Sequence, residues 1–156
     1  MKRTATSLFL GLCLAILAVA ASPAYARSTT GFSAFHVESP TASNPYKCLN
    51  ENNGAVVNNC TYDVSLEFDL PIDSAGEKSI IVQDYFEGTA AENTFSCTSY
   101  AYTGSKASST VGSAINFTGP TETLTTSVDV TEGDSIQVIC YNIPKGGGVA
   151  NFNWNP

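Results

Sequence analysis

The stretch CTYDVSLEFDLP, residues 60–71, alternates apolar and polar residues almost without exception. A period of two is typical of a β-strand with one face on a core and the other in water. Pro71 ends the run because proline cannot donate to a sheet ladder. One predicted face carries Cys60, Tyr62, Val64, Leu66, Phe68 and Leu70, and the other carries Thr61, Asp63, Ser65, Glu67 and Asp69.

The rest of the chain after residue 26 repeats this pattern and shows no helical periodicity. Tight turns rich in Gly, Pro, Asn and Asp separate the runs, which predicts an antiparallel β-sandwich of about eight strands in one domain, residues 27–156. The Ser-, Gly- and Thr-rich segment 103–113 is predicted to be a mobile loop. The expected strands cover residues 30–39, 60–70, 79–88, 94–104, 113–119, 122–130, 135–143 and 149–154.

The first 26 residues have the organisation of a secretory signal peptide. Lys2 and Arg3 precede an apolar run, and Ala24-Tyr25-Ala26 is an A-x-A cleavage signal. The apolar run is too short for a membrane span. We therefore expect cleavage after Ala26 and a mature protein that is secreted, to the periplasm or outside the cell, without membrane insertion.

The charge of the mature chain excludes some partners. Removing Lys2 and Arg3 from the seven Lys and Arg residues leaves five cations against fourteen Asp and Glu, a net charge of −9. The five cations are scattered singly, whereas nucleic acids and anionic lipids require clustered Lys and Arg. No nucleic-acid partner is expected.

Four cysteines remain after cleavage: Cys48, Cys60, Cys97 and Cys140. An even number in an exported protein predicts two disulfides, and four cysteines allow three connectivities. We favour Cys48–Cys60, because an Asn-Asn-Gly turn lies between them, and Cys97–Cys140, which joins two strand-like runs.

These features, taken in order, resemble a loose group of small exported bacterial β-rich proteins of unknown function. The shared motifs are an early cysteine with an Asn-rich turn, a strand ending at a proline, Ile81–Tyr85 (IVQDY), Cys97-Thr98 and the late Cys140–Pro144 (CYNIP). The group carries no established activity, so the resemblance implies no catalytic residue.

Nucleophilic catalysis has little support in the sequence. His36 is the one histidine, no G-x-S-x-G motif is present, and the cysteines are assigned to disulfides. PKGGG, residues 144–148, lacks the pattern of a phosphate-binding loop and is predicted to be a flexible turn or bulge. A hydrolase would need two carboxylates across a cleft, whereas the acids of residues 60–71 are expected on a solvated face. We expect no enzyme activity and no cofactor.

A weak calcium candidate lies in DVTEGD, residues 129–134. Asp129, Glu132 and Asp134 offer oxygen ligands of the kind that calcium takes, but without the spacing of a known calcium loop. An acidic hairpin turn is the favoured interpretation.

Aromatic residues are the strongest candidates for a ligand-binding surface. If Cys97 pairs with Cys140, parity places Tyr100, Tyr102 and Tyr141 together on the face away from the disulfide. That face is either core, which is the usual position of large apolar side chains, or an exposed platform of the kind that stacks on sugar rings. Trp154 poses the same choice.

The sequence therefore predicts a secreted, non-catalytic β-sandwich that acts as a binding or surface-interaction module. The alternatives are a carbohydrate-binding module that uses Tyr100, Tyr102, Tyr141 or Trp154, and a carboxylate-based hydrolase. The ligand, a glycan or a protein, is left open.

Overall fold

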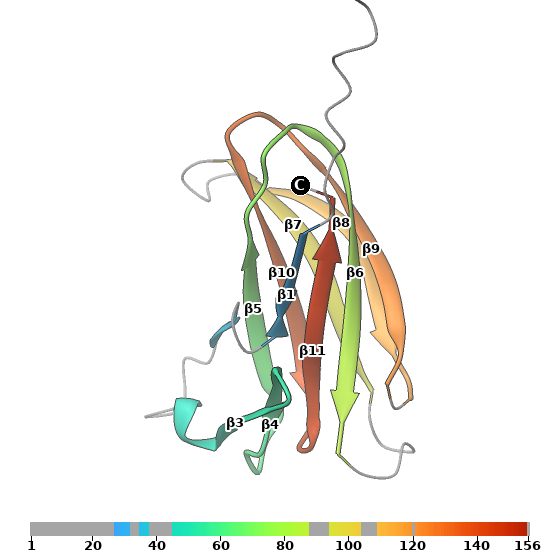
Figure 1. Ribbon diagram of the computed structural model, residues 1–156. Helices are drawn as coiled ribbons and strands as arrows, with labels where there is room; N and C mark the ends of the chain where they lie inside the picture. Colours follow the sequence, from blue (N-terminus) through green and yellow to red (C-terminus); the bar gives the residue numbers. More distant parts are fainter. Residues whose placement is uncertain are drawn as a thin grey trace, which may run out of the picture.

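The computed structural model describes residues 27–31, 35–37, 45–87, 94–103, 109–119 and 121–155 (Figure 1). The predicted signal peptide, residues 1–26, lies outside them. In chain order the elements are β1 (Arg27–Thr30), β2 (Phe35–Val37), a short 3-10 helix η1 (Pro45–Cys48), β3 (Leu49–Asn52), β4 (Ala55–Asn58), β5 (Val64–Leu70), β6 (Gly76–Phe86), β7 (Phe95–Thr103), β8 (Ser109–Phe117), β9 (Thr123–Val130), β10 (Asp134–Ile143) and β11 (Gly147–Trp154). In this part of the chain, no helix is long and apolar enough to cross a membrane.

The strands form two antiparallel sheets packed face to face (Figure 1). One sheet has the order β3-β4-β11-β6-β9, and β1 pairs with β11 beyond the end of its pairing with β4. The other sheet has the order β2-β5-β10-β7-β8. The predicted all-β antiparallel sandwich with two disulfides is confirmed.

The core between the sheets contains the apolar faces of the alternating strands. The rings of Phe68 on β5 and Phe152 on β11 meet across the two sheets with centroids 4.7 Å apart. Those of Phe95 and Phe117, on β7 and β8, stack at 4.7 Å. Burial of these side chains is the main favourable contribution to folding.

Residues 60–71 follow the predicted alternation once the strand has begun. Val64, Leu66, Phe68 and Leu70 are all buried. The prediction was wrong for Tyr62, which is 43% exposed. The physical reason is that β5 begins at Val64, so Tyr62 lies in the preceding loop, where the period of two does not apply.

The described residues contain more strands than the predicted eight, because β1, β3 and β4 are additional. Between Cys48 and Cys60, where the sequence predicts only a turn, the structure has a short hairpin of β3 and β4. Asn53 and Gly54 form its tip with φ values of 52° and 86°. Two successive residues with positive φ are characteristic of the two-residue hairpin turn that Asn-Gly favours.

Two predicted loops are partly strand. Residues 104–108 lie outside the described part, but Ser109–Ser113 belong to β8. In PKGGG the turn is short, and β11 already begins at Gly147. Gly148 allows a close approach of backbones, because a Cβ there would lie 2.2 Å from the carbonyl oxygen of Val56.

The two sheets also approach each other along one side, where β8 lies beside β9. The Thr126 hydroxyl lies 2.8 Å from the Ser99 hydroxyl, and the backbone N–H of Ser127 donates to Ser113 Oγ at 3.1 Å. Gly112 permits this contact, because a Cβ there would lie 2.1 Å from the carbonyl oxygen of Ser127. Since Ser99 lies on β7 and Thr126 on β9, their contact joins the two sheets.

Candidate functional site: the tyrosine face

The disulfide between Cys97 and Cys140 joins neighbouring strands of the five-stranded sheet. The two cysteines are direct partners in the β7–β10 ladder, with Cα atoms 4.0 Å apart, and both side chains are fully buried. The disulfide side of β7 and β10 is therefore the core side. Because successive side chains of a strand alternate, the opposite parity faces outward.

Tyr100, Tyr102 and Tyr141 have this outward parity, and each is partly buried. The hydroxyls of Tyr100 and Tyr141 lie 3.0 Å apart, within hydrogen-bond distance. The rings of Tyr100 and Tyr102 are nearly parallel, with an interplanar angle of 23° and centroids 5.9 Å apart. The structure thus brings all three tyrosines together, on the outer face rather than in the core.

Two apolar side chains extend this surface. Val111 on β8 is the register partner of Tyr100 and is 61% exposed. Ile139 on β10 also has outward parity, yet it is 6% exposed. We call the surface formed by Tyr100, Tyr102, Tyr141, Val111 and Ile139 the tyrosine face.

Sequence reasoning missed the two apolar members for different reasons. Val111 was assigned to a loop, although SSTVGSAINF contains enough β-forming residues to predict a strand. Ile139 has the same parity as Tyr141, and parity predicts which face a side chain is on but not how deeply it is buried.

A row of polar and acidic residues borders the tyrosine face on the β5 side. Gln137 and Ile139 on β10 are in register with Asp69 and Glu67 on β5. Gln137 Nε2 donates to Asp69 Oδ1 at 2.7 Å. The acids predicted on the wet side of this strand are there: Glu67 is half-buried and Asp69 exposed.

Trp154 is not part of this surface, which corrects the prediction that it binds a ligand. Its side chain is 4% exposed and belongs to the core cluster. Its indole N–H donates to the carbonyl oxygen of Pro71 at 2.9 Å. An indole ring can be buried in this way because its one polar group is satisfied by the backbone.

The calcium candidate is a turn, as the favoured interpretation had it. Asp134 Oδ2 accepts hydrogen bonds from the backbone N–H of Thr131 at 2.8 Å and from its hydroxyl at 2.7 Å. Asp129 and Glu132 are exposed. Among the described residues, no group of three or more His, Cys, Asp or Glu side chains is arranged to hold a metal ion.

Asp84 on β6 is a buried carboxyl that sequence reasoning did not single out. It faces inward with Ile80 and Val82, is 1% exposed, and its Oδ1 accepts the backbone N–H of Glu122. Oδ2 is buried without a hydrogen-bond partner. Burial raises the pKa of Asp84 to about 6, and the negative charge of Glu122 adds to this effect. The sequence signal for a buried Asp84 is the alternation in IIVQDY, which places residue 84 on the same side as Ile80 and Val82.

The Asp84–Glu122 pair meets one requirement of a carboxylate-based hydrolase, two acids in unlike environments. It lacks the other requirement, which is access for the substrate. The Asp84 side chain is sealed from solvent, and the Glu122 carboxylate accepts the backbone N–H of Thr118 at 2.7 Å. Asp84 and Glu122 instead join β6 to the residue before β9, because each backbone N–H donates to an oxygen of the other residue.

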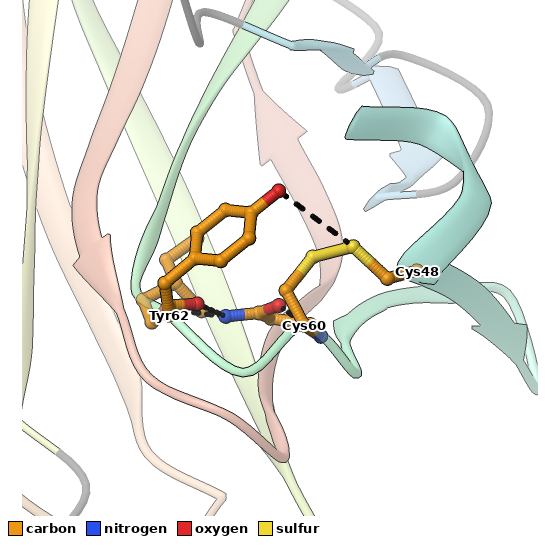
Figure 2. Close-up of a disulfide and its surroundings, with 5 residues drawn as sticks. Cys48, Cys60 and Tyr62 are labelled. Atoms are coloured by element: carbon orange, nitrogen blue, oxygen red, sulfur yellow. Dashed lines mark hydrogen bonds between the residues drawn. A yellow bond between two sulfur atoms is a disulfide. The ribbon is translucent and has the colours of Figure 1, made fainter. Parts of the chain in front are cut away.

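The other predicted disulfide, Cys48–Cys60, is also present and closes the β3–β4 hairpin (Figure 2). The hydroxyl of Tyr62 points to Cys48 Sγ at 4.0 Å. Asn58, fully buried, organises this corner: its Nδ2 donates to the carbonyl oxygens of Tyr62 and Ile143 at 2.9 and 2.8 Å. The hairpin is thereby joined to the end of β10.

Comparisons with known proteins give a fold and no family. No family model matches the chain. No curated protein matches it either.

Solved structures do match. The C-terminal CBM6 of LamC, a marine laminarinase from Zobellia galactanivorans, aligns over 85% of this chain and 100% of its own, with 12% identity and a TM-score of 0.53. The CBM36-1 domain of a xylanase from the hindgut metagenome of Trinervitermes trinervoides covers 85% and 98%, with 8% identity and a TM-score of 0.53. A family 35 carbohydrate-binding module from Clostridium thermocellum covers 83% and 98%, with 12% identity and a TM-score of 0.52. The chain therefore has a β-sandwich fold similar to that of carbohydrate-binding modules.

Proposed function

We propose that this chain is a secreted, non-catalytic carbohydrate-binding module, and that the tyrosine face is its sugar-contacting surface. The observation that carries the proposal is the position of Tyr100, Tyr102 and Tyr141, side by side on the outer face of one sheet. Of the alternatives that the sequence left open, this one agrees best with both the site and the fold.

The chemistry of tyrosine suits this task. Each ring offers an apolar body that can stack on the C–H face of a sugar ring, and a hydroxyl that can exchange hydrogen bonds with sugar hydroxyls. Aromatic side chains with two χ angles also bind at a low cost in conformational entropy. The exposed Val111 would add apolar contact area at the β8 side.

The position of the carboxyl with the raised pKa supports a binding role rather than catalysis. Asp84, the carboxyl with a raised pKa, is sealed in the interior and cannot reach a sugar on the outer face. The similarity to solved carbohydrate-binding modules is a similarity of fold and agrees with this proposal. The two disulfides are typical of an oxidising compartment, which supports secretion.

Affinity electrophoresis of the secreted protein against a panel of polysaccharides tests the proposal. We expect retardation by at least one polysaccharide, and we expect Tyr100→Ala to reduce the affinity by about tenfold or more. Ile81→Ala is the matched control, because Ile81 is 37% exposed on the outer face of the other sheet. Lack of binding to every polysaccharide, or equal losses in both variants, would contradict the proposal.

A further inference from the structure

A polar hollow lies at one end of the tyrosine face. We propose, on the basis of the carbohydrate-binding function above, that this hollow takes one sugar unit of the same bound chain. It recognises the hydroxyl groups of that unit through Ser96, Asn116 and Asn142. The tyrosine face then supplies contact area, and the hollow supplies recognition of one particular sugar.

The hollow is formed where β7 begins and where β8 and β10 end. Its volume is about 230 Å³, whereas pockets that enclose a whole drug-sized ligand measure about 300–1,000 Å³. It therefore suits a single sugar unit rather than a longer segment of a chain. Most of its lining is hydroxyl and amide side chains, from Thr94, Ser96, Asn116, Thr118 and Asn142.

The strand register places the hollow on the same outer face as the tyrosines. Tyr141 on β10 is opposite Ser96 on β7, and Ser96 is opposite Asn116 on β8. The three residues form one row across three strands, which spans about 10 Å at ~4.8 Å between neighbouring strands. A sugar unit over Ser96 and Asn116 thus lies beside Tyr141, within reach of a chain on the tyrosine face.

The side chain of Tyr141 leaves this row open. Tyr100 and Tyr141 are attached four rows apart, a separation of about 13 Å, yet their hydroxyls lie 3.0 Å apart. Both side chains must therefore extend along the sheet toward each other. Because Tyr141 leans away from Ser96 and Asn116, the largest side chain of the row does not fill the hollow.

A β-bulge turns Asn142 to the outside. Alternation from Cys140 places residue 142 on the core side, but the register between β10 and β5 shifts between Cys140 and Ile143. Two residues of β10, Tyr141 and Asn142, are thereby opposite a single residue of β5. As a result, Ile143 is fully buried and Asn142 is exposed.

The backbone of Asn142 is unusual for a residue inside a strand. Its φ is 57°, in the left-handed region, which asparagine tolerates better than most residues and glycine adopts more readily still. Bulges and uncommon backbone conformations are concentrated at functional sites, where they re-aim a side chain. The side chain that is re-aimed here lines the hollow.

The polar side chains of the hollow are available to a ligand. Within the part of the chain that the structure describes, no side-chain hydrogen bond engages Ser96, Asn116 or Asn142. An amide group has two N–H donors and a carbonyl acceptor, and a hydroxyl both donates and accepts. Each asparagine can therefore exchange hydrogen bonds with two neighbouring hydroxyls of one sugar.

Affinity electrophoresis of the secreted protein tests the hollow. The probes are laminarin, xylan, galactomannan and hydroxyethyl cellulose, and the one that binds the native protein best is used for the variants. Asn116→Ala and Asn142→Gly should each raise the dissociation constant by about threefold to tenfold, because each removes hydrogen bonds to one sugar.

Two matched controls separate binding from folding. Asn153→Ala removes an exposed asparagine from the outer face of the other sheet, and Asn53→Gly places a glycine at the exposed hairpin tip, where φ is 52°. Neither control should change the dissociation constant. Asn142→Gly should lower the thermal unfolding temperature no more than Asn53→Gly does, since glycine adopts a positive φ readily. A purely structural Asn142 would not lose affinity in a variant of this stability.

A combined variant tests whether the hollow and the tyrosine face hold the same chain. Tyr100→Ala plus Asn142→Gly should raise the dissociation constant by the product of the two single changes, because separate contacts with one ligand contribute independently. A combined change no larger than that of Tyr100→Ala alone would contradict a shared ligand.

The outcomes distinguish the two proposals. If Asn116→Ala and Asn142→Gly bind as well as the two controls while Tyr100→Ala is impaired, the role of the hollow is wrong and the proposed function stands. If the hollow variants are impaired and Tyr100→Ala is not, the hollow is the contact site and the tyrosine face is not. If no polysaccharide binds, both proposals fall.

Discussion

The two disulfides of this chain join very different parts of the molecule. Cys97 and Cys140 are 43 residues apart in sequence, are fully buried and lie opposite each other in the middle of a sheet. Cys48 and Cys60 are only 12 residues apart and close a hairpin at one end of the sandwich, with Cys48 partly exposed. The comparison separates a bridge that fixes strand register from one that closes a peripheral loop.

Register matters here because the tyrosine face depends on it. A slip of one residue between β7 and β10 would turn every side chain of one strand to the other side of the sheet. Tyr100 and Tyr141 belong to these two strands, and the disulfide ties the same strands on the inner side. The buried bridge is thus a positioning device for the outer surface.

The largest effect is expected on removing the buried bridge. Cys97→Ala plus Cys140→Ala should lower the free energy of unfolding by about 4 kcal/mol, because the closed loop is long. Urea unfolding followed by tryptophan fluorescence measures this change. The folded fraction should also bind carbohydrate more weakly, since the register is less constrained; full affinity in the folded variant would contradict the positioning role.

Removing the peripheral bridge should cost less. Cys48→Ala plus Cys60→Ala is expected to lower the free energy of unfolding by about 3 kcal/mol, because the closed loop is shorter. Neither cysteine lies on β7, β8 or β10, so carbohydrate affinity should stay at the native value. A loss of binding equal to that of the buried pair would remove the distinction between the two bridges.

Parity and turn chemistry made both bridges and the relation of the tyrosines to Cys97–Cys140 predictable from sequence. The choice of inner face was not predictable, because apolar residues lie on both sides of β10: Ile136 and Val138 on one, Ile139 and Tyr141 on the other. Only the position of the second sheet decides which side is core.

For Trp154, alternation predicts the face of the strand but not the hydrogen-bond partner of the indole. Alternation in VANFNW correctly groups it with Phe152, but its burial depends on the carbonyl group of Pro71, 83 residues away in sequence. Partners at such separations come from the topology. The hairpin of β3 and β4 was likewise hidden, because strands of four residues leave too short a pattern to detect.

The Asp84→Asn variant separates the contribution of a buried charge from that of the bridges, because disulfides do not titrate. The pKa of Asp84 is raised to about 6 in the folded protein, above its ordinary value of 3.8. The folded state therefore binds the proton more tightly, so this stabilisation is present at low pH and is lost as the pH rises through 6.

We expect the free energy of unfolding of the native protein to fall by about 2 kcal/mol between pH 4 and pH 7 through this group. Asp84→Asn should abolish that fall, since an amide can still accept the backbone N–H of Glu122 without being charged. Urea unfolding at several pH values gives the comparison. A variant with the same pH dependence as the native protein would show that Asp84 is not the responsible group.

The smallest effect is expected at Tyr62, beside the peripheral bridge. Its hydroxyl donates to Cys48 Sγ at 4.0 Å, a weak contact with a poor acceptor, and the side chain is 43% exposed (Figure 2). Tyr62→Phe keeps the ring and the backbone carbonyl that accepts from Asn58, so it should change the free energy of unfolding by no more than about 0.5 kcal/mol.

The same substitution in the Cys48→Ala plus Cys60→Ala background should have an equally small effect, because little coupling energy joins the two sites. A loss well above 1 kcal/mol that disappears in this background would mean that the hydroxyl–sulfur contact helps hold the hairpin, and that the peripheral bridge does more than close a loop.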